Sequence, residues 1–379
     1  MTSNSLLNIR HIIVFLGSMG LFSLIFLAKL IVVVGVPFYF FSIIFGGFLL
    51  FFLKKEKIFF INLQEFFVLV FMFWLLVPVV NAYNFSSSVL QYYYYLISFL
   101  LFFLIRRFCF NKQVWSLMAN SLLLGGGLTS ILMIVNWNVI LQGDRVNLND
   151  INANYLAYSL VTLLPILYIF FNNKYYKFYY ILLGLFSIAI FLTGSRGALI
   201  ALAFFYIILA FKKPIFGLII ALFAASFFTM FVGFYDSLPA YWQARFDFQG
   251  STGGDMDWTS GREATWSSAW KLFEEHYIFG IGLNNFPEIS GFGINVHNVF
   301  LSLLVETGIL GILFYFFSFL SIVFFVLRRN FLLGLILFVI EIPIFFTGVW
   351  ESSPVLWSVL SLLMAYGVLF NEKISERKF

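Results

Sequence analysis

The stretch VLQYYYYLISFLLFFLI at residues 89–105, followed directly by Arg106 and Arg107, decides the fold class of this chain. It is almost entirely apolar or aromatic, and its length is close to the roughly 20 residues that a helix needs to cross a bilayer core. Positive charges beside such a run collect on the cytoplasmic side of a membrane. The stretch therefore predicts a transmembrane helix whose C-terminal end faces the cytoplasm.

The composition of the whole chain supports this reading. Of its 379 residues, 62% are hydrophobic and only 10% are charged, whereas a soluble domain carries about 25% charged residues. The net charge of +5 does not indicate a nucleic-acid partner, because the basic residues are dispersed among the loops. The single cysteine, Cys109, excludes an internal disulfide and a cysteine-based metal cluster.

Similar apolar runs recur along the chain. They occupy residues 11–29, 30–53, 58–80, 89–105, 114–136, 153–171, 178–193, 197–211, 214–234, 297–327, 331–349 and 354–370. We therefore expect an all-α integral membrane protein with about twelve transmembrane helices. The short runs at 178–193 and 197–211 are also compatible with one broken segment, and the run at 297–327 is long enough to be tilted or to begin outside the bilayer.

The basic residues orient these helices. With the N-terminus inside, the cytoplasmic loops receive Arg10, Lys54, Lys55, Lys57, Arg106, Arg107, Lys112, Lys174, Lys177, Lys212, Lys213, Arg328, Arg329, Lys373, Arg377 and Lys378. The opposite side keeps Lys29, Arg145, Arg196, Arg245, Arg262 and Lys271. Every inner loop is then basic, which predicts that both termini are cytoplasmic. Arginines on the outer side are disfavoured, so they indicate an anionic partner there.

Three regions follow from this layout. Residues 1–234 hold the first nine helices, residues 235–296 form a long outer loop, and residues 297–379 hold the last three helices and a cytoplasmic tail. Within the loop, Trp266, Trp270 and Phe273 recur at the spacing of one helix face. The spacing predicts a short amphipathic helix from Arg262 to Phe273, on the membrane surface or against the bundle.

The first candidate for anion binding on the outer side is Arg145. Four asparagines follow it, at Asn147, Asn149, Asn152 and Asn154. Helix capping by Asp150 and Asn152 explains the asparagines equally well. Arg145 fits that explanation less well.

A second candidate is the turn Thr193-Gly194-Ser195-Arg196-Gly197. Glycines let backbone N–H groups approach an anion, and a guanidinium matches phosphate oxygens. An arginine that merely marks a helix end is the alternative. We favour anion binding, because Arg196 lies on the outer side within an apolar stretch.

The long loop supplies a third candidate. Ser260-Gly261-Arg262-Glu263 places an arginine where a helix begins, beside exposed backbone donors that attract anions. A local salt bridge with Glu263 is an equal alternative. Arg245 belongs to the same loop.

The fourth candidate begins with Gly280-Ile281-Gly282 and continues through His297-Asn298 to Glu306-Thr307-Gly308. The glycine pair is not a nucleotide-binding fingerprint, because no βαβ unit surrounds it. A neutral imidazole at His297 can take a proton from a hydroxyl, although lone histidines are usually structural. Glu306 lies about 180° around the helix from His297, so we expect it to contact another helix.

Metal chemistry has little support in the sequence. The three histidines (His11, His276 and His297) are at unrelated positions, and Asp255 and Asp257 lie in a glycine-rich stretch. We therefore expect no metal and no cofactor. Arginines would instead stabilise the charge of a leaving diphosphate.

In this order, the motifs resemble those of the O-antigen ligase/polymerase superfamily of bacterial envelope glycosyltransferases. The resemblance covers roughly residues 140–315 and is most specific from Arg262 to Gly311. The N-terminal third is similar only as generic apolar spans. Asn152-Ala153-Asn154 departs from the Asn-Pro-Asn that family members often carry.

The resemblance implies a multi-pass GT-C-type glycosyltransferase of the bacterial inner membrane, with an active site that faces the periplasm. The donor would be a glycan linked to undecaprenyl diphosphate, and the acceptor lipid A–core or another carrier-linked glycan. The reaction would be a metal-independent, inverting displacement. By motif, Arg196 and Arg262 would bind the diphosphate and His297 would activate the acceptor hydroxyl. Arg145 and Arg245 are weaker diphosphate ligands, and Asn154, Asn298 and Glu306 have supporting roles.

Alternatives remain at this point. The motifs do not separate an O-antigen ligase from a polymerase, and we favour the ligase slightly as the family's best-known activity. A lipid-linked glycan transporter or flippase also fits twelve spans. Its polar residues would line a cavity at the membrane midplane, where only Glu65 and Glu341 are expected to lie deep. An envelope assembly protein is disfavoured by the arginine and histidine motifs.

Overall fold

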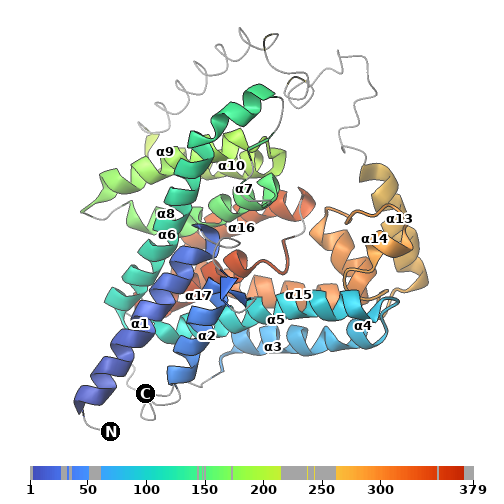
Figure 1. The fold of residues 1–379 in the computed structure, drawn as a ribbon, viewed down its shortest axis with the longest axis horizontal. Coiled ribbons are helices and arrows are strands. Elements are labelled where there is room, and N and C mark those ends of the chain that lie inside the picture. The colour runs from blue at the N-terminus through green and yellow to red at the C-terminus, as the bar shows by residue number, and fades with distance from the viewer. Residues whose placement is uncertain are drawn as a thin grey trace. The chain divides into compact units, whose positions relative to one another are not determined.

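The computed structural model describes residues 3–26, 32–33, 36–50, 61–142, 145–146, 148, 151–171, 174–214, 237, 243, 262–347 and 350–370 (Figure 1). The helices are α1 (Ser3–Phe26), α2 (Phe38–Leu50), α3 (Leu63–Trp74), α4 (Leu76–Val80), α5 (Phe85–Phe108), α6 (Lys112–Val135), α7 (Ala153–Thr162), α8 (Leu164–Phe170), α9 (Tyr176–Leu192), α10 (Arg196–Lys212), α13 (Arg262–Glu275), α14 (Phe286–Ile289), α15 (Val299–Arg329), α16 (Phe331–Thr347) and α17 (Pro354–Leu369). A 3-10 helix, η1, covers Trp137–Gln142, and the two-residue strands β1 (Val32–Val33) and β2 (Val36–Pro37) pair antiparallel.

Most of the described helices overlap the predicted apolar runs, and the chain is a multi-pass membrane protein whose number of spans stays a prediction. The stretches long and apolar enough to cross a bilayer are Leu63–Val80, Phe85–Phe108, Lys112–Val135, Ala153–Phe170 and Val299–Arg329. Shorter apolar helices cover Ile9–Ile25, Tyr176–Leu192, Phe331–Phe346 and Pro354–Leu369. The predicted span 214–234 lies, except for Pro214, outside the described residues.

Two of the predicted runs differ from single continuous helices. Within 30–53, the valines and Pro37 form the β1–β2 pair, and α2 begins only at Phe38. β-branched residues favour extended backbone, and proline has no N–H for a helix interior. The runs at 178–193 and 197–211 are two helices, α9 and α10, because Gly194 adopts a φ of +60° between them.

Contacts between Cα atoms divide the chain into two compact units. Unit 1 comprises Met1–Gly126, Arg262–Leu335 and Phe345–Phe379, and unit 2 comprises Gly127–Gly261 and Ile336–Ile344.

In unit 1, α1 packs on α2, α5 on α17, and α3 and α13 on α15. Large aromatic side chains fill the space between these helices. Trp357 meets Phe99 edge-to-face with 4.8 Å between ring centroids, and Trp115 donates its indole N–H to the Leu362 carbonyl at 2.8 Å. Aromatic pairs of this kind stabilise packing beyond the area that they bury.

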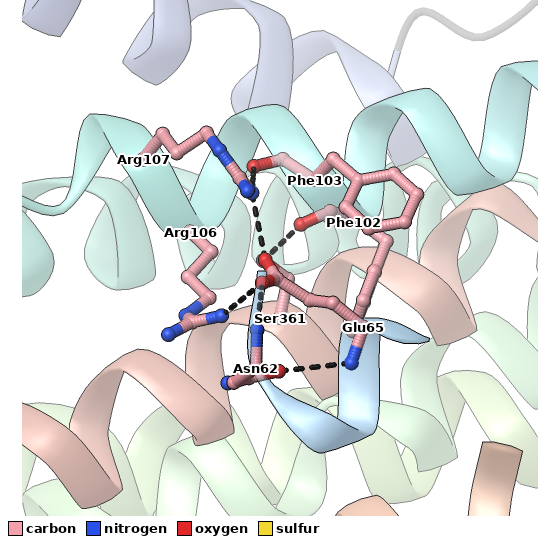
Figure 2. Close-up of polar contacts among 7 residues, drawn as sticks. All are labelled: Asn62, Glu65, Phe102, Phe103, Arg106, Arg107 and Ser361. Atoms are coloured by element: carbon pink, nitrogen blue, oxygen red, sulfur yellow. Dashed lines mark hydrogen bonds and ion pairs between the residues drawn. The ribbon is translucent and has the colours of Figure 1, made fainter. Parts of the chain in front are cut away.

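A buried carboxylate connects α3 to α5 (Figure 2). The side chain of Glu65 is 0% exposed and lies 2.7 Å from Nη1 of Arg106 and 2.7 Å from Nη1 of Arg107. Glu65 also completes a capping box with Asn62, in which each side chain accepts from the other residue's backbone N–H. The arginines that end the 89–105 run therefore also hold α3 and α5 together, since a buried charge is stable only when it is paired.

In unit 2, α7 packs on α9 and α10, and α8 packs on α9. The rings of Phe170 and Tyr179 stack with 4.7 Å between centroids. Glu341, expected to lie deep, is buried on α16 and accepts a hydrogen bond from the Thr162 hydroxyl at 3.1 Å.

Candidate functional site

Arg145 connects the beginning of α7 to the turn before α10 within unit 2. Its Nε donates to the Thr193 carbonyl at 2.7 Å, and its Nη2 donates to Oδ1 of Asn154 at 2.5 Å. Asn152 caps α7 by accepting from the backbone N–H of Asn154, as the capping interpretation predicts. Arg145 therefore holds two of the predicted motifs against each other, and its role as a diphosphate ligand stays a prediction.

The turn that leads into Arg196 is rigid. The Thr193 hydroxyl donates to the Ile190 carbonyl at 2.6 Å and accepts from the backbone N–H of Ser195 at 3.1 Å. Gly194 reverses the chain with its positive φ, a conformation that other residues rarely adopt. Arg196 is then the first residue of α10 and is half-buried. Its guanidinium adds to the positive end of a helix dipole, which favours an anion.

The predicted helix in the long loop is confirmed as α13, which begins at Arg262 and extends to Glu275. The predicted apolar face is divided between packed and exposed side chains. Ala269 is buried in a core with Ile281, Phe286, Val296 and Val305, and Leu272 and Trp266 pack against it. Trp270 is 48% exposed, and its indole N–H donates to Glu274 on the same helix. Small Ala269 allows α13 to pack closely on α15.

His297 lies where the chain enters α15. Its backbone is in the left-handed region, with a φ of +52°, which non-glycine residues rarely adopt outside constrained sites. Asn298 follows as the N-cap of α15, and its Oδ1 accepts from the Leu301 N–H at 3.2 Å. Partial burial, together with the nearby Arg262 guanidinium, lowers the pKa of His297. The imidazole is therefore neutral at neutral pH, beside a fixed positive charge.

The two glycine motifs of the fourth candidate contact each other through their backbones. Ile281 N–H donates to the Val305 carbonyl at 2.9 Å, and Gly282 N–H donates to the Glu306 carbonyl at 3.2 Å. Ile309 N–H returns a bond to the Tyr277 carbonyl at 2.8 Å. We call residues 276–286, which run along α15, the strap.

Glycine is required at the closest points of this contact. Gly308 has a φ of +70° and a ψ of −177°, so it breaks α15 into 299–307 and 309–329. A Cβ on Gly308 would meet the Ile278 carbonyl, and one on Gly280 would meet the Glu306 backbone. Sequence reasoning missed this pairing, although two glycine motifs in one loop-to-helix segment were a signal for it.

Glu306 acts on the same strap. Its carboxylate accepts hydrogen bonds from the backbone N–H groups of Asn284 and of Phe286, the first residue of α14, in agreement with the expectation that Glu306 contacts another helix. The strap thus covers the face of α15 on which Glu306 lies. Asn285, which sequence reasoning also missed, is fully buried and donates to the Ser88 hydroxyl at 2.7 Å.

The predicted site residues thus form two groups. Unit 1 brings together Arg262 and His297, with Asn298 capping α15 and Glu306 anchoring the strap. Unit 2 brings together Arg145, Asn154 and the turn that precedes Arg196. Arg245 lies outside the described residues.

Comparison with known proteins gives one family. No curated protein matches the chain. Residues 181–316 match the family model described as O-antigen ligase. This segment holds Arg196, Arg262, His297 and Glu306 and ends beyond the glycine motif at Gly308, whereas Arg145 and Asn154 precede it. The matched segment supports the predicted resemblance to the O-antigen ligase/polymerase superfamily.

Proposed function

We propose that this protein is a glycosyltransferase that moves a glycan from undecaprenyl diphosphate to an acceptor hydroxyl. The observation that carries the proposal is that His297 lies near enough to Arg262 to feel its charge. Burial and the guanidinium keep the imidazole neutral, so it can accept a proton, while the same guanidinium is suited to a diphosphate oxygen. Such a base and cation side by side are what displacement of a diphosphate by a hydroxyl requires.

The reaction proceeds as a displacement at the anomeric carbon of the donor. The acceptor oxygen forms a bond to that carbon while its proton passes to His297. The bond from the anomeric carbon to the diphosphate oxygen breaks, and undecaprenyl diphosphate leaves with inversion of configuration. Arg262 stabilises the negative charge that develops on the leaving oxygen, so we propose that the step needs no metal ion. Arg145, Arg196 and Arg245 stay proposed diphosphate ligands on the sequence motifs.

The acceptor that we favour is lipid A–core, which makes the protein an O-antigen ligase. The description of the matching family model supports this preference. A polymerase, which extends a carrier-linked glycan, shares the same donor chemistry and is the alternative. We place the protein in the bacterial inner membrane with cytoplasmic termini, and the outer loop 235–296 in the periplasm, on the distribution of its basic residues.

The test is transfer by the purified full-length protein with undecaprenyl-diphosphate-linked glycan, lipid A–core and EDTA. A lipid A–core product that survives EDTA supports the metal-independent ligase. Extension of the carrier-linked glycan alone replaces the ligase with the polymerase. Loss of transfer on chelation overturns the metal-independent mechanism.

Variants test the site itself. We expect His297→Ala and Arg262→Ala to lower the transfer rate at least about 100-fold, the usual contribution of a general base or a charge-stabilising group. Lys271→Ala is the matched control, because Lys271 is an exposed cation on the same helix and should transfer normally. Wild-type rates in both site variants would overturn the proposal.

A further inference from the structure

A cleft of about 390 Å³ lies in unit 1, and neither Arg262 nor His297 lines it. Its lining consists of Asn81, Glu275, His276, Tyr277, Ile278, Phe279 and Gly280. Asn81 follows the end of α4, and the other residues run from the end of α13 into the strap. The volume is within the range of about 300–1,000 Å³ that is typical of small-molecule sites.

Backbone hydrogen bonds, a ring stack and a side-chain hydrogen bond hold the walls of the cleft in place. His276 accepts from the Gly280 N–H at 2.9 Å, and Tyr277 accepts from the Ile309 N–H at 2.8 Å. The ring of Phe279 stacks on Trp74 with 6.1 Å between centroids. Asn81 is fixed as well, since its side chain donates to the Val77 carbonyl at 3.2 Å. A fixed cleft loses little conformational entropy when a ligand binds.

The lining combines two kinds of surface. The rings of Tyr277 and Phe279 remain 56% and 48% exposed, which leaves apolar area for a ligand. Asn81, Glu275 and His276 provide an amide, a carboxylate and an imidazole, which together donate to and accept from hydroxyl groups. A sugar ring has the same division, with an apolar face of C–H groups and an edge of hydroxyls.

The charge of the cleft argues against a phosphate. The described residues that line it include one carboxylate, Glu275, and no lysine or arginine. A carboxylate repels an anion at close range. The cleft therefore differs in ligand chemistry from the Arg262–His297 pair.

We propose that this cleft binds a neutral or amine-bearing sugar residue of the transferred glycan or its acceptor. The inference rests on the proposed function, since it identifies where the saccharide is held outside the transfer site. The strap contacts α15 at Ile309, just past the break at Gly308, and the helical segment from Val299 to Thr307 is roughly 12 Å long. The glycan would thus be held a few sugar units from His297.

The experiment measures binding of a free oligosaccharide to the purified full-length protein in detergent. The probe is the oligosaccharide released by mild acid from the lipid-linked glycan that accumulates in a strain lacking this protein. Saturation-transfer NMR gives its dissociation constant. We expect Tyr277→Ala and Asn81→Ala to weaken binding about tenfold, which corresponds to the loss of one good contact.

Matched controls lie on the same helix. Trp270→Ala removes an exposed ring and Glu274→Gln removes an exposed carboxylate, and neither residue lines the cleft. Both controls should bind the oligosaccharide as the wild type does. Equal binding by the cleft variants and the wild type, or no binding by the wild type, overturns the inference. Displacement of the oligosaccharide by phosphatidylglycerol vesicles would overturn it in favour of a lipid headgroup.

The transfer assay separates this inference from the proposed function. If the cleft variants lose oligosaccharide binding while His297→Ala still transfers glycan, the proposed mechanism fails and the saccharide site stands. If transfer depends on His297 and Arg262 while the cleft variants bind normally, the saccharide site alone fails.

Discussion

The indole N–H of Trp266 donates to the backbone carbonyl of Val296 at 3.0 Å. This bond joins the first turns of α13 to the residue that precedes His297, so it fixes the left-handed backbone of His297 relative to Arg262. The strap and Glu306 support the same segment from the side of α15. The proposed base is thus held by residues that do not react.

Removal of this bond tests that role. Trp266→Phe keeps most of the ring but loses the donor, and we expect it to destabilise the protein by about 1 kcal/mol, the usual net contribution of a hydrogen bond. The transfer rate should fall about tenfold, because the imidazole is less well positioned. Trp270→Phe, at the exposed position, should change neither the unfolding midpoint nor the rate. A Trp266→Phe enzyme with a normal rate would show that His297 is positioned without this bond.

The pH dependence of transfer follows from His297. Burial and Arg262 lower its pKa, so the base form persists below the ordinary value of about 6.5, and activity should fall only as the pH drops through the lowered value. Arg262→Gln removes the second of these causes, so the pKa should rise and the acid limb should move to higher pH. The acid limb is measured from the kcat/KM of glycan transfer by both proteins between pH 4.5 and 8. An unshifted limb would mean that Arg262 does not influence the base.

Glu65→Gln tests the buried ion pairs between α3 and α5. The substitution leaves the half-buried Arg106 and Arg107 without their counter-charge, and we expect a loss of about 2–3 kcal/mol in the free energy of unfolding. Thermal unfolding in detergent measures it. Glu288→Gln is the control, because Glu288 accepts its hydrogen bond from Asn84 on the exposed surface. An unchanged midpoint in Glu65→Gln would contradict a structural role for the pairs.

Substitution of Gly308 tests the break in α15, and substitution of Gly184 in α9 is its control. Gly308→Ala introduces a Cβ at a φ of +70° and against the Ile278 carbonyl, so we expect at least about 2–3 kcal/mol of destabilisation and loss of transfer. Gly184→Ala, inside α9, meets nothing within 4 Å and should stabilise its helix by about 0.5–1 kcal/mol. Equal unfolding midpoints for both variants would show that the strap is not packed as closely as described.

The local sequence pattern was sufficient to predict most of the membrane helices that the structure describes. The run at 89–105 became α5, and Arg106 and Arg107 end it as predicted. In lipid, each span must satisfy its own backbone hydrogen bonds, so an apolar run of the right length has few structures other than a helix. The helix that begins at Arg262 was predicted for a related reason, because its periodic apolar side chains belong to one short segment.

The sequence by itself determined that the chain is a multi-pass helical membrane protein and which motifs relate it to O-antigen ligases, because both are properties of residues adjacent in the chain. Only the tertiary structure decided which face of α13 is buried, that Gly280 and Gly308 permit one backbone contact, and that Glu306 holds the strap. These contacts join residues far apart in the chain, and their partners are selected by close packing. Periodicity and spacing within a single segment therefore do not predict these contacts.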